Sequence, residues 1–121
     1  MMYFTDSHEW IRVEDGLGTV GVTAHAKNEL GEIVYLELPE IGRQVKAGEE
    51  VVILESTKAA ADIYTPVSGE IVAVNETVRA APDLLNQSPE ESGWLFKIRL
   101  SNPQELGFLM TRSAYQQLVD S

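Results

Sequence analysis

The sequence predicts a mainly β protein with short helices and a helical tail at its C-terminus. Apolar and polar residues alternate in short runs up to about residue 100, as they do in half-buried strands. The tetrapeptide GEIV occurs twice, at 31–34 and at 69–72, and each copy opens an apolar run. Two similar β halves favour a pseudo-symmetric sandwich or flattened barrel whose inner faces share one core.

The predicted strands account for most of residues 10–100, which are the expected β core. The runs with strand character lie at 10–14, 17–23, 32–38, 51–55, 63–67, 70–74 and 95–100. Asp15 and Gly16 predict a tight turn between the first two runs. Pro39 ends the third run, because proline cannot donate a hydrogen bond to a strand ladder.

Short helices are predicted between and after these strands. Residues 24–30 favour a helix with Thr23 as its N-cap and Gly31 at its C-terminal end. The second copy of the repeat carries an insert at 81–93 that favours a short helix and a loop. The tail, at about 102–120, has the apolar spacing of helices.

Within the tail, Asn102 is expected to cap a helix over 102–110, with Pro103 in the first turn. The apolar residues expected to share one face of that helix are Leu106, Leu109 and Met110. A second helical segment is expected at 112–120. Together with the β core, the tail completes one predicted domain over 1–121.

Composition limits the classes of function. Nine basic and nineteen acidic residues give a net charge of −10, so nucleic acid and anionic membranes are poor partners. No apolar run has the length of a transmembrane span, and the first ten residues lack the features of a signal or transit peptide. We therefore expect a cytoplasmic protein. Without cysteine, disulfides and thiolate metal sites are excluded, and His8 and His25 are too few for a histidine-rich metal site.

The stretch LESTKAAADIY, which contains Lys58, could form a short helix or a hairpin. Ser56 could cap a helix, but Pro66 would end it within about two turns, which is marginal for an isolated helix. Apolar runs on both sides favour a hairpin between strands at 51–55 and 60–64. Lys58 then lies at the tip and points to solvent.

An exposed lysine is most often a solubilising charge. Two features favour a functional role for Lys58 instead. The residues around it are small, so an enzyme could reach the amine. It also lies midway between the two GEIV copies, where a rigid β scaffold could present a swinging group.

The pattern ES-x-KA, formed by Glu55, Ser56, Lys58 and Ala59, resembles the lipoyl-lysine motif of the glycine cleavage system H proteins. Further segments resemble that family in its order: SHEW at 7–10, TVGVT at 19–23, LGEIVYLELPEIG at 30–42, VKAGE at 45–49, DIYTPVSGE at 62–70 and GWLFKI at 93–98. The resemblance covers nearly the whole chain. It implies a lipoyl/biotinyl barrel-sandwich hybrid with the modified lysine at a hairpin tip.

The resemblance also implies a function. Lys58 would form an amide with lipoic acid, attached by a lipoate ligase or a lipoyl/octanoyl transferase. The protein would be a carrier and co-substrate, not an enzyme. It would shuttle an aminomethyl group from glycine decarboxylase to the tetrahydrofolate-dependent aminomethyltransferase, and dihydrolipoyl dehydrogenase would reoxidise the arm. A monomer is expected, because the carrier must present its arm to several partners in turn.

In this family the loaded arm folds back against the protein, which implies contacts with Ser7, Glu9 and Asp62 here. A carboxylate can hold the ammonium of the arm by a charge-assisted hydrogen bond. The residues alone equally allow Ser7 as a turn residue, with Glu9 and Asp62 as solvated charges. His8 is expected to be structural and Trp10 to lie in the core.

Other hypotheses use the same lysine differently. A lipoyl relay would donate lipoate to 2-oxoacid dehydrogenase subunits. A biotin carrier is disfavoured, because methionines usually flank its lysine, whereas Thr57 and Ala59 flank Lys58 here. A Schiff-base enzyme would need a desolvated lysine in a pocket, with a depressed pKa. An interaction module without a cofactor would tolerate the loss of Lys58.

Overall fold

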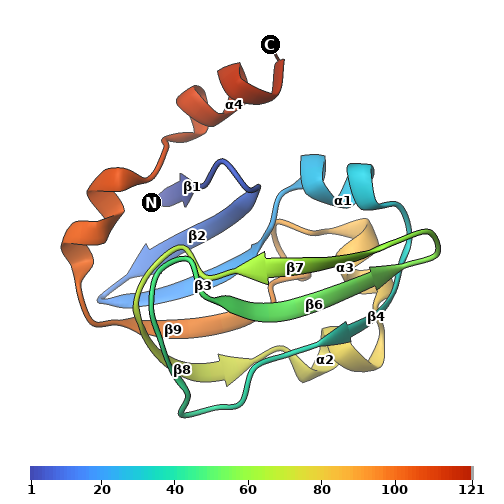
Figure 1. Ribbon diagram of the computed structural model, residues 1–121, viewed down its shortest axis with the longest axis horizontal. Coiled ribbons are helices and arrows are strands. Elements are labelled where there is room, and N and C mark those ends of the chain that lie inside the picture. The colour runs from blue at the N-terminus through green and yellow to red at the C-terminus, as the bar shows by residue number, and fades with distance from the viewer. Residues whose placement is uncertain (121) are drawn as a thin grey trace.

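The computed structural model describes residues 1–120, which form two antiparallel sheets that pack face to face (Figure 1). The strands of the larger sheet are β1 (Met2–Phe4), β2 (Glu9–Glu14), β3 (Leu17–Val22), β5 (Gln44–Val45), β8 (Gly69–Val74) and β9 (Phe96–Leu100). Those of the smaller sheet are β4 (Ile33–Glu37), β6 (Glu50–Ser56) and β7 (Ala60–Tyr64). Their orders are β1-β2-β3-β9-β8-β5 and β4-β6-β7. The predicted mainly β class is confirmed.

The helices are short and lie outside the sheets (Figure 1). They are α1 (Ala24–Leu30), α2 (Glu76–Ala80), α3 (Asp83–Gln87), the 3-10 helix η1 (Pro103–Phe108) and α4 (Arg112–Asp120). The Thr23 hydroxyl accepts a hydrogen bond from the Ala26 amide at 3.2 Å, which confirms the predicted cap of α1. No helix within residues 1–120 is long and apolar enough to cross a membrane.

The two GEIV copies start strands in opposite sheets. The first copy leads into β4 of the smaller sheet, and the second forms the start of β8 in the larger sheet. Side chains from both sheets meet in the core, among them Ile11 and Val20 from one and Ile33 and Leu54 from the other. Each such side chain stabilises the fold by about 1.5–3 kcal/mol when fully buried.

A second apolar cluster joins the N-terminus to the C-terminal helix. Phe4 and Trp10 are fully buried there beside Tyr115 of α4, and the Phe4 and Tyr115 rings stack at 4.9 Å. The Tyr115 hydroxyl lies 2.7 Å from both His8 Nδ1 and Thr23 Oγ1. The predicted core position of Trp10 and structural role of His8 are therefore confirmed.

The edge of the smaller sheet is closed at the start of β4. The Ile33 amide donates to Asn86 Oδ1 at 2.8 Å, and Asn86 Nδ2 donates to the Ile33 carbonyl at 3.0 Å. The side chain of Asn86, which belongs to α3, thus takes the place of a neighbouring strand. Because the amide of asparagine carries both a donor and an acceptor, it can satisfy both backbone groups.

Two expectations about elements are wrong, and two short strands were not expected. The strand expected at 63–67 ends at Tyr64, because the backbone then turns and the Thr65 hydroxyl donates to the Val67 carbonyl at 2.8 Å. The helix expected at 102–110 is a 3-10 helix, and Asn102 makes no side-chain cap for it. Strands β1 and β5 went unpredicted, since two or three residues carry no readable period.

The three apolar residues of the tail do not share one helix face. Leu106 and Leu109 pack against the main core, whereas Met110 packs against the cluster of Phe4. Phe4 and Met110 also exchange two backbone hydrogen bonds of 2.8 Å. The tail is thereby attached to the N-terminal strand before α4 begins.

Candidate functional site

Lys58 lies at the tip of a β-hairpin. Strands β6 and β7 pair with Leu54 opposite Ala61 and Glu55 opposite Ala60. The Ser56 amide donates to the Ala59 carbonyl at 2.7 Å and closes a two-residue loop of Thr57 and Lys58. The predicted hairpin is therefore confirmed, and the helical alternative for this stretch is wrong.

Ser56 holds the loop by its side chain. Its hydroxyl oxygen accepts hydrogen bonds from the Lys58 amide at 3.2 Å and the Ala59 amide at 3.0 Å, and its proton reaches the Ala59 carbonyl at 3.1 Å. Serine commonly orders turns in this way. The hydroxyl that could have capped a helix instead caps the turn that carries the lysine.

The tip also touches the connection between α1 and β4. The Thr57 amide donates to the Glu32 carbonyl at 3.1 Å. In Figure 1 the hairpin tip lies beside this connection, away from the N-terminus and α4. Lys58 itself is exposed, and the two residues after it, Ala59 and Ala60, are exposed and small. No carboxylate within residues 1–120 forms a salt bridge with Lys58.

These features fit an amine that is acylated by another protein. The amine is accessible, its backbone is ordered, and no bulky side chain stands beside it in the loop. An attached arm would extend into solvent from a fixed point. The same exposure is unsuited to Schiff-base catalysis, which requires a desolvated amine.

Glu9 occupies a different environment from the one expected of a solvated charge. Only 1% of Glu9 is exposed. Its Oε1 accepts hydrogen bonds from Thr5 Oγ1 at 2.5 Å and Ser7 Oγ at 2.7 Å, and its Oε2 accepts a longer one from the Tyr64 amide at 3.4 Å. These bonds compensate the carboxylate for the loss of water.

Ser7 and Glu9 line the same surface pocket, whose volume is about 370 Å³. Its apolar wall includes Phe4, Tyr64 and Phe108. Asp62 is exposed on β7 and does not line this pocket. The structure thus brings together two of the three residues expected to contact a loaded arm.

The pocket and the hairpin tip lie toward opposite ends of β7. Glu9 binds the amide of Tyr64, the last residue of that strand, whereas Lys58 precedes its first residue. A strand advances about 3.3 Å per residue, so the six steps from Lys58 to Tyr64 span roughly 20 Å. Asp62 lies between these two ends, on the exposed face.

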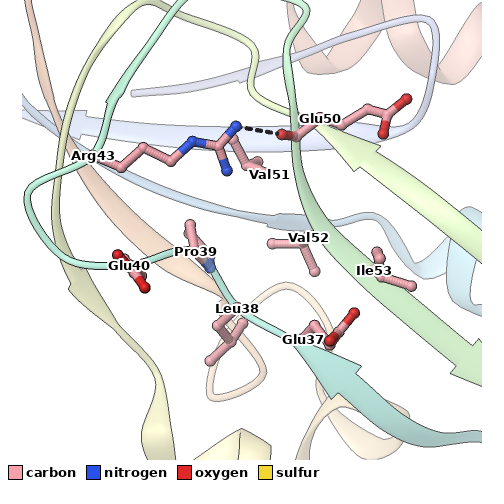
Figure 2. A pocket seen from close by; sticks show the side chains of 9 residues that line it. All are labelled: Glu37, Leu38, Pro39, Glu40, Arg43, Glu50, Val51, Val52 and Ile53. Carbon is pink, nitrogen blue, oxygen red and sulfur yellow. Dashed lines mark hydrogen bonds between the residues drawn. The ribbon is translucent and has the colours of Figure 1, made fainter.

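A second hollow, of about 410 Å³, lies between the end of β4 and the start of β6. Figure 2 shows Arg43 reaching across it to the Glu50 carbonyl, to which it donates at 3.0 Å. Arg43 also donates to Glu49 at 2.6 Å, and this hydrogen bond lowers the pKa of the Glu49 carboxyl. None of the predicted site residues lines this hollow.

Comparisons with known proteins agree with one another. The family model described as glycine cleavage H-protein matches residues 2–121. The glycine cleavage system H protein of Alcanivorax borkumensis is 52% identical over 118 residues, covering 98% of this chain and 92% of that protein. The H protein of Thermotoga maritima is 51% identical over 117 residues, covering 97% and 94%.

A solved structure also matches. The crystal structure of a glycine cleavage system H protein from Mycobacterium marinum superposes with a TM-score of 0.91 at 35% sequence identity. The match covers 99% of this chain and 97% of that one. The barrel-sandwich architecture expected from the sequence is therefore confirmed, because the two chains share their fold over nearly all of their length.

Proposed function

Because the chain belongs to the glycine cleavage H-protein family, a family of carrier proteins, we propose that Lys58 bears a lipoyl group in an amide bond. Through this arm the protein would carry an aminomethyl unit from glycine decarboxylase to the tetrahydrofolate-dependent aminomethyltransferase. Dihydrolipoyl dehydrogenase would then restore the arm. The protein would act as a monomeric co-substrate in the cytoplasm.

The observation that carries this proposal is the presentation of Lys58. Its backbone is fixed by Ser56 and by the Thr57–Glu32 hydrogen bond, while its amine is exposed beside small residues. A lipoyl group, when bound, supplies the sulfur chemistry. The chain supplies the position from which the arm is offered to each partner.

Lys58 is exposed, an environment unsuited to catalysis by a desolvated amine. Neither of the two cavities described above includes Lys58. This arrangement supports a role in which the partner enzymes provide the enclosed sites and the carrier provides the arm. A lipoate ligase or a lipoyl/octanoyl transferase would need only to approach the exposed tip.

Modification of Lys58 is tested by intact mass. The protein is incubated with a lipoate ligase, ATP and lipoate, and a known carrier serves as the positive control. One lipoyl group per chain is expected, located on Lys58 by peptide mapping. An unchanged mass, under conditions that fully modify the control, would rule out the lipoyl function.

We also propose that Ser7, Glu9 and Asp62 hold the loaded arm. The buried Glu9 carboxylate would attract the ammonium, Ser7 would keep that carboxylate in place, and Asp62 would add negative charge along the path between the tip and the pocket. The pair of Ser7 and Glu9, 2.7 Å apart in one pocket, supports the inner part of this path.

Asp62→Asn is the informative variant for this path, because Asp62 is exposed and its change should leave the fold intact. The aminomethyl-loaded variant should release its group several-fold faster than the loaded wild type. Glu37→Gln, an exposed change on β4 of the same sheet and outside the lipoyl-lysine motif, is the matched control. Equal release rates for both variants and the wild type would show that Asp62 does not hold the loaded arm.

The same lipoylated protein separates glycine cleavage from a lipoyl relay. In one reaction it is incubated with glycine, glycine decarboxylase, the aminomethyltransferase and tetrahydrofolate. In another it is incubated with an unmodified 2-oxoacid dehydrogenase lipoyl domain and a lipoyl-transferring enzyme. Carriage of the aminomethyl unit is expected in the first reaction. Transfer of lipoate to the acceptor domain alone would assign the relay function instead.

A further inference from the structure

We propose that Gly31 is a positioning residue for Lys58, an inference that rests on the proposed lipoylation of that lysine. Gly31 follows α1 directly, 27 residues before the lysine, and nothing in its local sequence connects it with the hairpin. The absence of a side chain at Gly31 lets the stem of Lys58 lie across the connection between α1 and β4. The amine is thereby aimed before any enzyme arrives.

The geometry is close. A β-carbon placed on Gly31 with standard geometry would lie 3.0 Å from Lys58 Cε, and 3.8 Å from both Lys58 Cδ and Nζ. Two carbon atoms make their best contact at about 3.5–4.0 Å, so a methyl group at this position would push the end of the lysine away. The stem of the lysine therefore rests against a bare backbone.

Both sides of this contact are held. On one side, the Gly31 amide donates to the Lys27 carbonyl at 3.0 Å, and Ile33 is fixed by Asn86. On the other side, the Thr57 amide donates to the Glu32 carbonyl at 3.1 Å, and Glu32 lies between Gly31 and Ile33 in the chain. The segments that carry the lysine and the glycine are thus both held in place by hydrogen bonds.

A helix stop alone does not account for the contact. The backbone of Gly31 has φ of 90° and ψ of −158°, a region that is populated almost only by glycine. That conformation explains why glycine ends α1. It does not require a lysine stem 27 residues away to lie over the glycine, so Gly31 meets two separate demands.

The contact matters for the acylation step. The Lys58 ammonium must first lose one proton to become a nucleophilic amine. Nζ then bonds the acyl carbon of an activated lipoyl donor, the activating group leaves with the electron pair of the bond that breaks, and Nζ gives up a second proton to form the amide. A misplacement of about 1 Å in a reacting group can cost roughly 10²-fold in rate. An amine whose stem already rests on Gly31 has fewer orientations to lose when the ligase binds.

The test compares Gly31→Ala with Gly42→Ala. Gly42 also has a positive φ, of 97°, but a β-carbon there would meet nothing within 4 Å. Gly42→Ala therefore reports the cost of alanine at a positive φ without the contact with Lys58. We expect kcat/KM for lipoylation by a lipoate ligase to fall about tenfold for Gly31→Ala relative to Gly42→Ala.

A direct readout on the unmodified protein accompanies the rates. NMR with isotope-labelled glycine and lysine should show a nuclear Overhauser effect between the Gly31 α-protons and the Lys58 ε-protons of the wild type. In Gly31→Ala, the Lys58 Cε resonance should shift while those of other lysines stay unchanged. If Gly31 only supported the fold, its substitution would not shift the Lys58 Cε resonance selectively.

The outcomes separate the two proposals. If the wild type accepts no lipoyl group, the carrier function fails, whatever the NMR spectra show. If the wild type is modified but the two alanine variants slow equally, Gly31 does not position the lysine. The absence of the wild-type Overhauser effect would also overturn the proposal, and that measurement stands even if Gly31→Ala does not fold.

Discussion

The two ends of β7 place charged groups in opposite environments. At the hairpin tip, Ser56–Ala59, a lysine is exposed and its position is set by hydrogen bonds of the loop. At the N-terminal corner, where Phe4, His8 and Trp10 pack around Tyr115, the carboxylate of Glu9 is 1% exposed and accepts three hydrogen bonds. One end is ordered without being buried, and the other is ordered because it is buried.

The difference shows two ways in which a small protein can hold a charged group in place. A group that several enzymes must reach has to remain in water, so deep burial cannot hold it, and hydrogen bonds of the loop fix its backbone instead. A group that would shelter a reactive ammonium must be withdrawn from water, and it then needs partners for its own charge. Substitutions at the tip should therefore change modification, and those at the corner should change stability.

The largest contrast is expected from Lys58→Arg. Lipoylation should be abolished, because a guanidinium is always protonated and does not take the acyl group. The free energy of unfolding should change by less than about 0.5 kcal/mol, since the side chain is exposed. Intact mass and urea denaturation measure the two effects. A loss of several kcal/mol would show that the tip is a structural element after all.

Glu9→Gln should produce the reverse pattern. The neutral amide weakens the charge-assisted hydrogen bonds from Thr5 and Ser7, so the free energy of unfolding should fall by roughly 1–3 kcal/mol. The rate of lipoylation at the distant tip should be unchanged. Glu55→Gln, on an exposed residue, should cost less than about 0.5 kcal/mol in the same urea titration. Equal costs for the two variants would mean that burial of Glu9 contributes nothing.

Tyr115→Phe tests the N-terminal corner through the pH dependence of folding stability. Burial raises the pKa of the Tyr115 phenol above its ordinary value, with smaller contributions from the charges of Glu90 and Glu9. The folded state thus favours the protonated phenol. Its contribution to stability is complete below about pH 10 and is lost as pH rises through the higher folded pKa.

Two results follow for that variant. Loss of the hydroxyl contacts with His8 and Thr23 should cost about 1 kcal/mol at neutral pH. Above about pH 10, the wild type should lose stability more steeply than the variant. Thermal unfolding measured between pH 7 and 11 gives both quantities, and parallel curves for the two proteins would contradict the assigned role of burial.

The smallest effect is expected from Ser56→Ala. Three hydrogen bonds of the loop are lost, but water can replace them, so the free energy of unfolding should fall by only about 0.5–1 kcal/mol. Lipoylation should slow a few-fold, because the tip becomes less ordered. Thr57→Ala, in the same loop, leaves these bonds in place and provides the control. If the two variants are lipoylated at the same rate, Ser56 does not help to present Lys58.

Local signals made the tip predictable. Apolar runs on both sides and Pro66 beyond them favoured a hairpin over a helix, and the loop that forms is short enough to be specified by its own residues. The cap of α1 by Thr23 was predictable for the same reason, since donor and acceptor lie three residues apart. Family resemblance then led to the prediction that Lys58 carries a lipoyl group.

At the N-terminal corner, Trp10 and His8 were placed correctly, but the burial of Glu9 was not predictable because its contacts join distant parts of the chain. Tyr64 lies 55 residues from the carboxylate that binds its amide, and Tyr115 lies 107 residues from His8. Nothing in the segment SHEW distinguishes a buried glutamate from a solvated one. The approach of Lys58 to Gly31 has the same origin, because only the assembled sheets bring the hairpin over the end of α1.

The side chain of Asn86 bears on whether copies of this protein associate through their strand edges. An open strand edge is a template for the strand of another molecule, and such pairing leads to aggregation. At β4 that template is spoiled, since the side chain of Asn86 already occupies the amide and carbonyl of Ile33, and the strand is irregular between Ile33 and Tyr35. One asparagine thus occupies the backbone groups at the start of this edge, which disfavours the pairing of a second copy there.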